Sequence, residues 1–359
     1  MFAADIAIQR LRQQRISQSE FERPEQVVAW LGAVQAQDYY GALWAVGLRM
    51  HNATEAMVEQ ALVERTIVRT WLMRGTLHFV APADIRWILQ LTRPRLRQLS
   101  NNAIRYQRLE LDEAVLARCY RVLEKALEGG KQLTRLELAA VLERGRIATG
   151  GLRLSFILAR TQAEGLICQA ARRGKQHTFA LLDEWLPSGR KLEHDEALAE
   201  FAWRYFMSHG PATLQDFAWW TGFLLADARA GLEAAKPRLA QETVAGQTYW
   251  LSQSLPTNPV GDPGAILLPG FDEFLVSYTD RRAALNAQHI NQWNRASTLL
   301  SPTIVIDGRV AGTWKRTLTR GGVTISPALF APLDPAAGQA FTDAVHHYAG
   351  FLGLPVVMD

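Results

Sequence analysis

The chain has 359 residues, of which 48% are hydrophobic and 21% charged; such proportions are typical of a soluble globular protein with roughly two to four domains. The formal net charge of +4 is small for this length, so total charge alone gives weak support for an anionic partner. The two cysteines, Cys119 and Cys168, have no CxxC spacing, which suits a reducing cytoplasm and two buried apolar side chains. The sequence has neither a signal-peptide pattern nor an apolar run approaching ~20 residues, so we expect no membrane association.

The first part of the chain has the pattern of a winged helix-turn-helix. Apolar residues recur at helical spacing in residues 24–36, with Val34 on the stripe, and again in residues 54–67, where Thr54 can act as the N-cap. Gly75 then separates two apolar runs, which predicts two strands joined by a tight reversal. Helix, helix and strand pair is the order of a winged helix.

The same order recurs in the next part of the chain. Residues 131–147 predict a helix that opens with a capping box formed by Thr134 and Glu137. Residues 152–167 predict a second helix, and residues 167–181 predict a hairpin. A long Arg-rich helical stretch separates these two units.

A looser third copy and a different kind of domain follow. Residues 195–251 contain a helix that Thr213 can cap and a hairpin around Gly246. From about residue 256 the composition changes to short β-type runs with glycine turns, followed by an amphipathic helix at the C-terminus. The prolines that mark the linker and loop are Pro256, Pro259, Pro263 and Pro269. We therefore predict an α+β fold with three tandem winged helix-turn-helix units and a small, mostly β C-terminal domain; the boundaries are residues 1–100, 101–190, 191–255 and 256–359.

The common motifs for cofactors and metals are absent. The sequence contains no GxxxxGK[ST], GxGxxG after a strand, HExxH or GxSxG motif. The His194-Asp195-Glu196 triplet lacks the PCxxC partner of zinc deaminases and predicts a solvated helix start. His346 and His347 are adjacent on a helix and face different ways. We therefore expect no cofactor and no metal site.

Basic residues at the tip of the second hairpin suggest a nucleic-acid partner. Arg172, Arg173 and Lys175 surround its turn, where a wing rests on the DNA backbone and phosphate contacts supply much of the affinity. A solvated basic face is the alternative, and winged helices also occur in purely protein-binding assemblies. Other basic clusters are Arg93, Arg95 and Arg97; Arg281 and Arg282; and Lys315, Arg316 and Arg320.

Gln35 and Gln37 form the most informative pair in the sequence. On a helix, positions i and i+2 lie on nearly opposite sides, so the helix must end or unwind if the two side chains share a site. Asp38 and Gly41, which disfavour a continuous helix, permit this. Glutamine cannot be a strong base, but its carbonyl can hold a water and its dipole can stabilise a positive charge. Alternatively, the pair caps backbone groups at a helix C-terminus.

Such weak chemistry suits one class of substrate. A purine alkylated at N7 or N3 is already cationic, and its glycosidic bond breaks toward an oxocarbenium-like sugar. An enzyme that acts on it needs little more than a placed water and modest electrostatic help.

Five stretches in this order resemble the AlkZ-like (YcaQ-type) winged-helix DNA glycosylases, which unhook interstrand crosslinks and excise N-alkylated purines. The resemblance extends over the full length of the chain. The stretches are AVQAQD (33–38) with the family's Gln-x-Gln, TWLMRGTLHFV (70–80), GPATLQDFAWWTG (210–222), LLPGFDEFLVSYTDR (267–281) and PTIVIDGRVAGTWKR (302–316).

The resemblance implies three winged helices and a β-barrel-like C-terminal domain around a concave DNA channel. It implies that Gln35 and Gln37 are catalytic: they would position the hydrolytic water and stabilise the sugar cation. A related branch has Asp in place of the second Gln, so Gln37 aligns this chain with the AlkZ-like branch. The implied reaction is monofunctional hydrolysis on double-stranded DNA that contains alkylated purines or crosslinks. We expect a monomer in the cytoplasm of a bacterium, associated with the nucleoid.

Four further residues belong to these stretches. Arg74 and His78 lie in the first strand pair, where they would contact the lesion or a phosphate, or else make structural hydrogen bonds. Asp272 and Glu273 follow a β-type run; they would order the site across the channel or form a local turn or salt bridge. Two alternative functions remain at this stage: a winged-helix regulator without catalysis, and a scaffold that binds other proteins.

Overall fold

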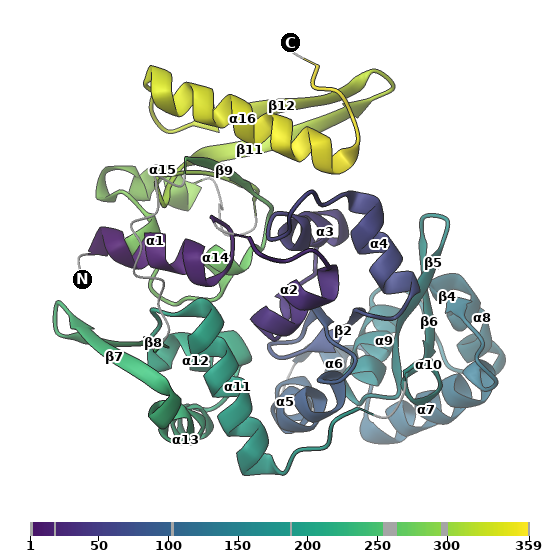
Figure 1. The fold of residues 1–359 in the computed structure, drawn as a ribbon. Helices are drawn as coiled ribbons and strands as arrows, with labels where there is room; N and C mark the ends of the chain where they lie inside the picture. Colours follow the sequence, from purple (N-terminus) through teal and green to yellow (C-terminus); the bar gives the residue numbers. More distant parts are fainter. Residues whose placement is uncertain are drawn as a thin grey trace.

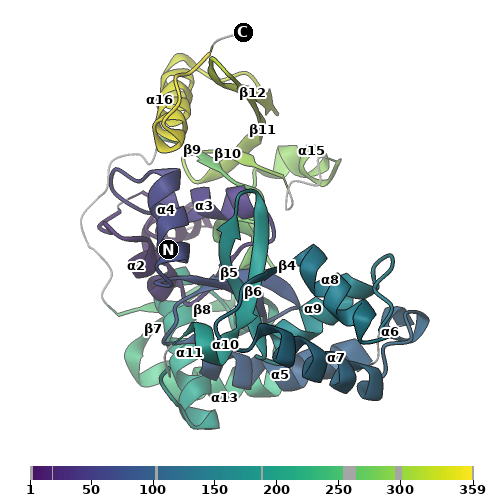
Figure 2. The same ribbon diagram turned by 90° about the vertical axis from the view of Figure 1, so that its right-hand side faces the viewer.

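The computed structural model describes residues 3–17, 19–101, 104–186, 189–253, 264–295 and 301–357. Three regions, each built of helices and a hairpin, are followed by a C-terminal region that packs on the first of them (Figure 1). Figure 2 shows the same arrangement from the side, with the C-terminal region at one end of the molecule. Pro256, Pro259 and Pro263 lie outside the described residues. No helix of the described part combines the length and hydropathy needed to cross a membrane.

The first region follows an N-terminal helix and departs from the sequence prediction at one point. Its first helix begins at Pro24 and ends at Leu31, because Gly32 adopts a positive φ of 79°. Val34 therefore belongs to a strand, and the predicted helix at 24–36 is too long by five residues. The elements are α1 (Ala3–Gln13), α2 (Pro24–Leu31), β1 (Val34–Gln35), α3 (Tyr39–Gly47), α4 (Glu55–Val63), β2 (Val68–Leu72) and β3 (Thr76–Val80).

The second region confirms the predicted capping box and hairpin. Thr134 accepts a hydrogen bond from the backbone N–H of Glu137, and the Glu137 side chain accepts one from the N–H of Thr134. The hairpin turns at Gly174, which has a φ of 61°. The elements are α5 (Ile85–Asn101), α6 (Ile104–Arg108), α7 (Glu113–Leu127), β4 (Leu133–Thr134), α8 (Arg135–Arg144), α9 (Arg153–Ala163), β5 (Ile167–Arg173), β6 (Gln176–Leu181) and α10 (Leu182–Trp185).

The third region repeats this order. Thr213 and Asp216 form a second capping box, and the hairpin turns at Gly246. In each region a short extended segment between helices pairs with the last hairpin strand: β1 with β3, β4 with β6, and Ala212 with Trp250. The elements are α11 (His194–His209), α12 (Leu214–Thr221), α13 (Leu225–Ala235), η1 (Lys236–Arg238), β7 (Leu239–Val244) and β8 (Gln247–Ser252).

The first two regions share a single sheet. Its six strands lie in the order β1-β3-β2-β5-β6-β4. The two halves meet where Arg69 on β2 is paired with Gln169 on β5. Because β1 is the strand at one end of this sheet, its free edge faces the neighbouring regions.

The C-terminal region is an open sheet, so the barrel-like expectation is not met. Its four strands lie in the order β12-β11-β10-β9 without closure among the described residues. One helix packs on the sheet instead, with Tyr348 against Trp314 at 5.0 Å between ring centroids, and so buries apolar surface without closure. The elements are β9 (Ala265–Leu268), α14 (Glu273–Val276), η2 (Arg282–Ala284), η3 (Ala287–His289), α15 (Ile290–Arg295), β10 (Thr303–Ile306), β11 (Arg309–Thr319), β12 (Gly322–Leu329) and α16 (Pro335–Leu352).

A shared core attaches the C-terminal region to α3. The indole N–H of Trp44 donates to the carbonyl of Leu267 at 2.6 Å. The Trp44 ring also lies 5.0 Å from the rings of Tyr348 and Phe351 on α16. The position of the β1–α3 segment is therefore coupled to the C-terminal sheet.

Two glycine substitutions should test this junction with opposite signs. Gly47 ends α3 against Phe351, and a Cβ there would overlap the buried ring. Gly47→Ala should therefore lower the free energy of unfolding by about 1–3 kcal/mol. Gly338 lies in α16 with open space around its Cα, so Gly338→Ala should raise it by about 0.5–1 kcal/mol. Urea denaturation measures both; equal effects would contradict the close contact between α3 and α16.

Candidate active site

The Gln-x-Gln motif lies on extended backbone rather than on a helix. Gln35 is paired with His78 across β1 and β3, and the ladder continues through Ala36, whose N–H donates to the carbonyl of Leu77 at 2.7 Å. Gln37 follows in a bend just beyond β1, so no continuous helix runs through the motif. The geometrical objection that a helix would raise is therefore removed.

The Gln35 side chain is held in one orientation. It is 7% exposed, and its Oε1 accepts a hydrogen bond from Nη2 of Arg74 at 3.1 Å. Arg74 also donates to the carbonyls of Trp219 and Trp220. Because a guanidinium can only donate, the carbonyl of the Gln35 amide must face Arg74.

Gln37 is the exposed member of the pair. Its Oε1 accepts a hydrogen bond from the backbone N–H of Leu77 at 3.2 Å, as a strand carbonyl would do one step further along the ladder. This donor fixes the orientation of the amide, and the carbonyl oxygen keeps a second lone pair for another donor. Water and DNA can thus reach a Gln37 side chain that is already oriented.

A buried arginine supports the strand from behind. The carbonyl of Ala36, between the two glutamines, accepts hydrogen bonds from Nε and Nη2 of Arg69 at 3.0 and 2.7 Å. Nη1 of Arg69 donates to Gln169 of the second region at 2.7 Å. Burial lowers the pKa of Arg69 to about 10, so it stays charged at neutral pH. Nothing in the sequence pattern distinguishes Arg69 from the other arginines.

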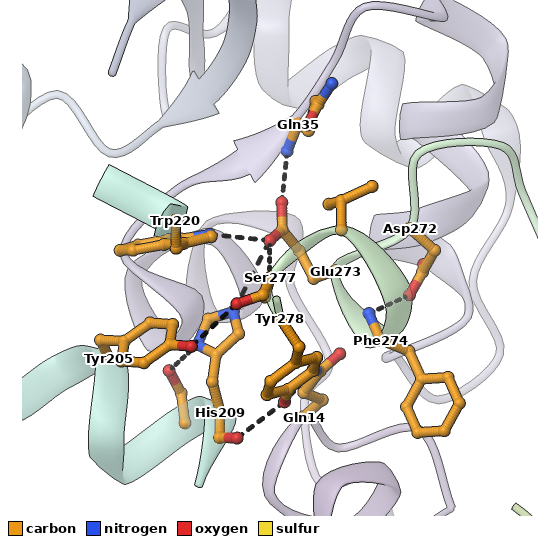
Figure 3. Close-up of polar contacts among 12 residues, drawn as sticks. Gln14, Gln35, Tyr205, His209, Trp220, Asp272, Glu273, Phe274, Ser277 and Tyr278 are labelled. Carbon is orange, nitrogen blue, oxygen red and sulfur yellow. Dashed lines mark hydrogen bonds and ion pairs between the residues drawn. The ribbon is translucent and has the colours of Figure 1, made fainter. Parts of the chain in front are cut away.

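Glu273 lies at the meeting point of the first, third and C-terminal regions (Figure 3). Its Oε1 accepts a hydrogen bond from the backbone N–H of Gln35 at 2.7 Å. Its Oε2 accepts from the indole of Trp220 at 2.9 Å and from the hydroxyl of Ser277 at 2.5 Å. Burial alone would raise the pKa of Glu273, but His209, Ser277 and the N–H of Gln35 lower it to about 2. The carboxylate is therefore ionised and holds the backbone of the motif.

Asp272, the residue before Glu273, has a structural role. Its two oxygens accept from Nη1 and Nη2 of Arg49 at 3.0 and 2.9 Å, and both side chains are fully buried. Oδ1 also accepts from the N–H of Phe274 and so caps α14. Asp272 thus forms a local cap and a salt bridge and does not reach solvent.

His78 is fully buried. Its Nδ1 lies 2.9 Å from the carbonyl of Thr76. Burial, with Arg74 nearby, lowers the pKa of His78 to about 4, so the ring is neutral at pH 7. The predicted contact with DNA is not supported, because the His78 side chain is fully buried, although its pairing with Gln35 puts the two side chains on the same face of the sheet.

The hairpin tip is less positive than its sequence suggests. Arg172 pairs with Glu59 at 2.7 Å, and Arg173 pairs with Glu137 at 2.9 Å. Lys175 is exposed and has no ion-pair partner among the described residues. Two of the three predicted phosphate contacts therefore start from charges that carboxylates already neutralise.

Two predicted basic residues from distant segments meet at Tyr40. The Cζ atoms of Arg172 and Arg316 each lie 5.5 Å from its ring centroid. Arg316 also donates to the hydroxyl of Tyr348. Lys315, its neighbour on β11, is exposed. The second and C-terminal regions thus place positive charge next to the start of α3, directly after the Gln-x-Gln motif.

Among the described residues, no group of three or more His, Cys, Asp or Glu side chains could hold a metal ion. Sequence reasoning missed Arg69, His209, Ser277 and the tryptophans of α12 as neighbours of the motif. The only signal for the tryptophans was their place in one of the five resembling stretches.

Similarity to known proteins identifies the family of this chain. The model of the AlkZ-like DNA glycosylase family matches residues 28–351, so the chain belongs to the AlkZ-like family and is a DNA glycosylase. The interstrand DNA cross-link repair glycosylase of Streptomyces sahachiroi is 29% identical over 315 residues, which cover 80% of this chain and 81% of that protein. The solved structure of Streptomyces sahachiroi DNA glycosylase AlkZ matches with a TM-score of 0.79 and 23% identity, over 100% of both chains.

Breaking the buried ion pair should cost stability. Asp272→Asn leaves Arg49 buried without a counterion, so the free energy of unfolding should fall by about 3–5 kcal/mol. Asp280→Asn is the matched control, because Asp280 pairs with Arg282 at the surface and should change stability by less than about 1 kcal/mol. Urea denaturation at pH 7 measures both. A similar small loss for the two variants would contradict the structural position of Asp272.

The buried histidine predicts a pH dependence of stability. The pKa of His78 is about 4 in the folded protein and about 6.5 in an unfolded chain. Between these values the unfolded state binds more protons, so stability is fully present above pH 6.5 and is lost as the pH falls toward 4. Between pH 7 and 4.5 this residue alone should remove about 2 kcal/mol. Urea denaturation should show a shallower pH dependence for His78→Gln; an unchanged slope would contradict the assignment.

Proposed function

We propose that this DNA glycosylase hydrolyses the N-glycosidic bond of purines made cationic by alkylation at N7 or N3, including those joined in interstrand crosslinks. The observation that carries the proposal is the pair of uncharged amides at and just after β1, with Gln37 exposed and its carbonyl oriented by Leu77. The nearby carboxylate of Glu273 is buried and bonded to the strand backbone. The printed name of the Streptomyces sahachiroi relative, a cross-link repair glycosylase, supports the extension to crosslinks.

The reaction balances without a strong base. The bond between C1′ and the purine nitrogen breaks, and its electron pair neutralises the positive charge of the base. Water adds its oxygen to C1′ and gives one proton to solvent. The products are a neutral alkylated base and an abasic sugar. Because the leaving group is already activated, positioning of the water contributes most of what the protein must supply.

The two amides have different tasks in this mechanism. The second lone pair of the Gln37 carbonyl accepts a hydrogen bond from the water and directs the water oxygen toward C1′. Gln35 is less exposed, and its carbonyl oxygen faces Arg74. Because Arg74 offsets the carbonyl dipole, Gln35 stabilises the sugar cation only at close range. A phosphate of the bound strand would neutralise Arg74 and so remove the electrostatic repulsion between Arg74 and a cationic sugar.

The proposed DNA-binding fold uses the three repeated regions. Each has the order helix, short extended segment, two helices and hairpin, which supports three tandem winged helices within residues 1–100, 101–190 and 191–255. The C-terminal region, within residues 256–359, closes one side of the channel. Phosphate contacts come from Lys175, Lys315 and Arg316; Arg172 lies beside the same Tyr40 ring, but Glu59 neutralises its charge. One chain contains all these parts, so we expect a monomer to suffice.

Gln37→Ala tests the proposal most directly. It should reduce release of N7-methylguanine from alkylated duplex by at least about tenfold, because the water loses its acceptor. The affinity for duplex DNA should change by less than about twofold, since the amide makes no phosphate contact in the proposed mechanism. Chromatography of the released base and a filter-binding titration measure the two quantities.

Asp38→Asn is the control for this experiment. Asp38 is an exposed carboxylate adjacent to Gln37 and would be the obvious general base in a conventional mechanism. The variant should keep wild-type excision. Loss of excision in Asp38→Asn with full activity in Gln37→Ala would replace amide chemistry by acid–base chemistry, and no release of base by the wild type would overturn the proposal.

A further inference from the structure

An exposed tryptophan lies next to the amide pair. Trp219 on α12 is 43% exposed. Its indole N–H donates to the carbonyl of Val276 at 2.9 Å, which holds the polar edge of the ring. Its own carbonyl accepts from Arg74, the residue that orients Gln35. The exposed ring is therefore fixed in place within two side chains of the candidate active site.

Two guanidinium groups flank this ring. The Cζ atoms of Arg74 and Arg281 lie 5.8 and 5.9 Å from its centroid. The hydrogen bonds from Arg74 go to carbonyl oxygens, and Nε of Arg281 donates to the carbonyl of Leu275 at 2.7 Å. Nη2 of Arg281 is buried and has no hydrogen-bond partner among the described residues. Neither arginine is hydrogen-bonded to a carboxylate in the described structure, so an external anion can use both charges once the Arg281 side chain turns its Nη2 outward.

A second tryptophan–arginine pair shows what a satisfied contact looks like in this protein. The Cζ atom of Arg238 lies 3.6 Å from the ring centroid of Trp203, which is stacking distance. The arginines beside Trp219 are more than 2 Å farther from their ring centroid, at 5.8 and 5.9 Å. Neither arginine is therefore stacked on the Trp219 ring, and no other aromatic ring of the described residues packs against it.

We propose that Trp219, Arg74 and Arg281 bind one nucleotide of the DNA strand beside the lesion. The base or sugar packs on the indole, and the phosphate accepts hydrogen bonds from the guanidinium groups. A nucleotide fits because it joins an aromatic face to an anion at this spacing, and aromatic stacking tolerates any base. The inference rests on the proposed function, since it assigns part of the same substrate to these residues. It makes Trp219 a substrate-binding residue rather than a member of the core.

The test compares Trp219→Leu with Trp203→Leu. Both remove an indole near arginine, but only Trp219 belongs to the proposed contact. Binding to a duplex with a tetrahydrofuran abasic analogue should weaken by roughly tenfold or more in Trp219→Leu, and Trp219→Phe should recover most of it. Excision of N7-methylguanine should show a raised KM with kcat within about twofold. Trp203→Leu should bind and excise as the wild type does.

The phosphate contact has its own readout. For Arg281→Gln, the slope of log affinity against log salt should fall by about one. Arg282→Gln should change the slope less, because Asp280 already neutralises Arg282 at 2.6 Å. Melting temperatures identify any variant that folds poorly. If Trp219→Leu folds poorly, DNA binding by Trp219→Phe and the salt dependence of Arg281→Gln test the nucleotide contact in its place.

The outcomes separate the two proposals. Wild-type excision together with unchanged binding and KM in Trp219→Leu would overturn the nucleotide contact and leave the proposed function intact. An unchanged salt slope in Arg281→Gln would likewise remove the phosphate from the assignment. Absence of excision by the wild type would overturn the proposed function. The comparison of DNA binding by Trp219→Leu and Trp203→Leu would still test the nucleotide contact.

Discussion

The arrangement of the active site depends on the hydrogen bonds that the carboxylate of Glu273 accepts. Its oxygens accept from the backbone of Gln35 in the first region and from Trp220 in the third, while Ser277 in the same C-terminal segment completes the set. A buried charge is costly unless every lone pair finds a donor. Because these donors come from segments more than 50 residues apart in the sequence, the charge is satisfied only when the three regions meet in one arrangement. The strand that carries the amides is thereby fixed at its backbone.

Fixing the backbone matters because the amides themselves are weak groups. Gln35 and Gln37 carry no charge, so their effect on a reaction depends on where their carbonyl oxygens point. Arg74 and the N–H of Leu77 set those directions. Arg69 holds the intervening carbonyl of Ala36 from the other face of the sheet. In the proposed chemistry, this rigidity replaces the reactivity that a carboxylate would provide, and the substrate supplies the charge.

Five arginines of this chain fall into two groups according to the partners that they have. Arg49 and Arg69 are buried and bonded to protein acceptors, so they contribute to structure. Arg173 belongs to the same group in effect, since Glu137 neutralises it at the surface. Arg74 and Arg281 lie beside an exposed ring without a hydrogen-bonded carboxylate, which favours an external anion. Counting basic residues along the sequence therefore overestimates the unneutralised charge at the hairpin tip and misses the two arginines beside α12.

The sequence by itself determined the capping box of Thr134 and Glu137, the cap at Thr213, the hairpins at Gly174 and Gly246, the glutamine pair and the family, because these depend on local spacing and short motifs. It missed α1, β1 and α3 in the first region. It mispredicted the backbone at Val34, since a helical stripe and a buried strand both need apolar residues and only Gly32 separates them. Tertiary structure alone decided that β1 is extended, that His78 is buried and that Glu273 holds the motif. It also decided that the four C-terminal strands that the structure describes form an open sheet. These outcomes depend on contacts between segments far apart in the chain, and residue spacing along a sequence carries no information about which distant donor meets which acceptor.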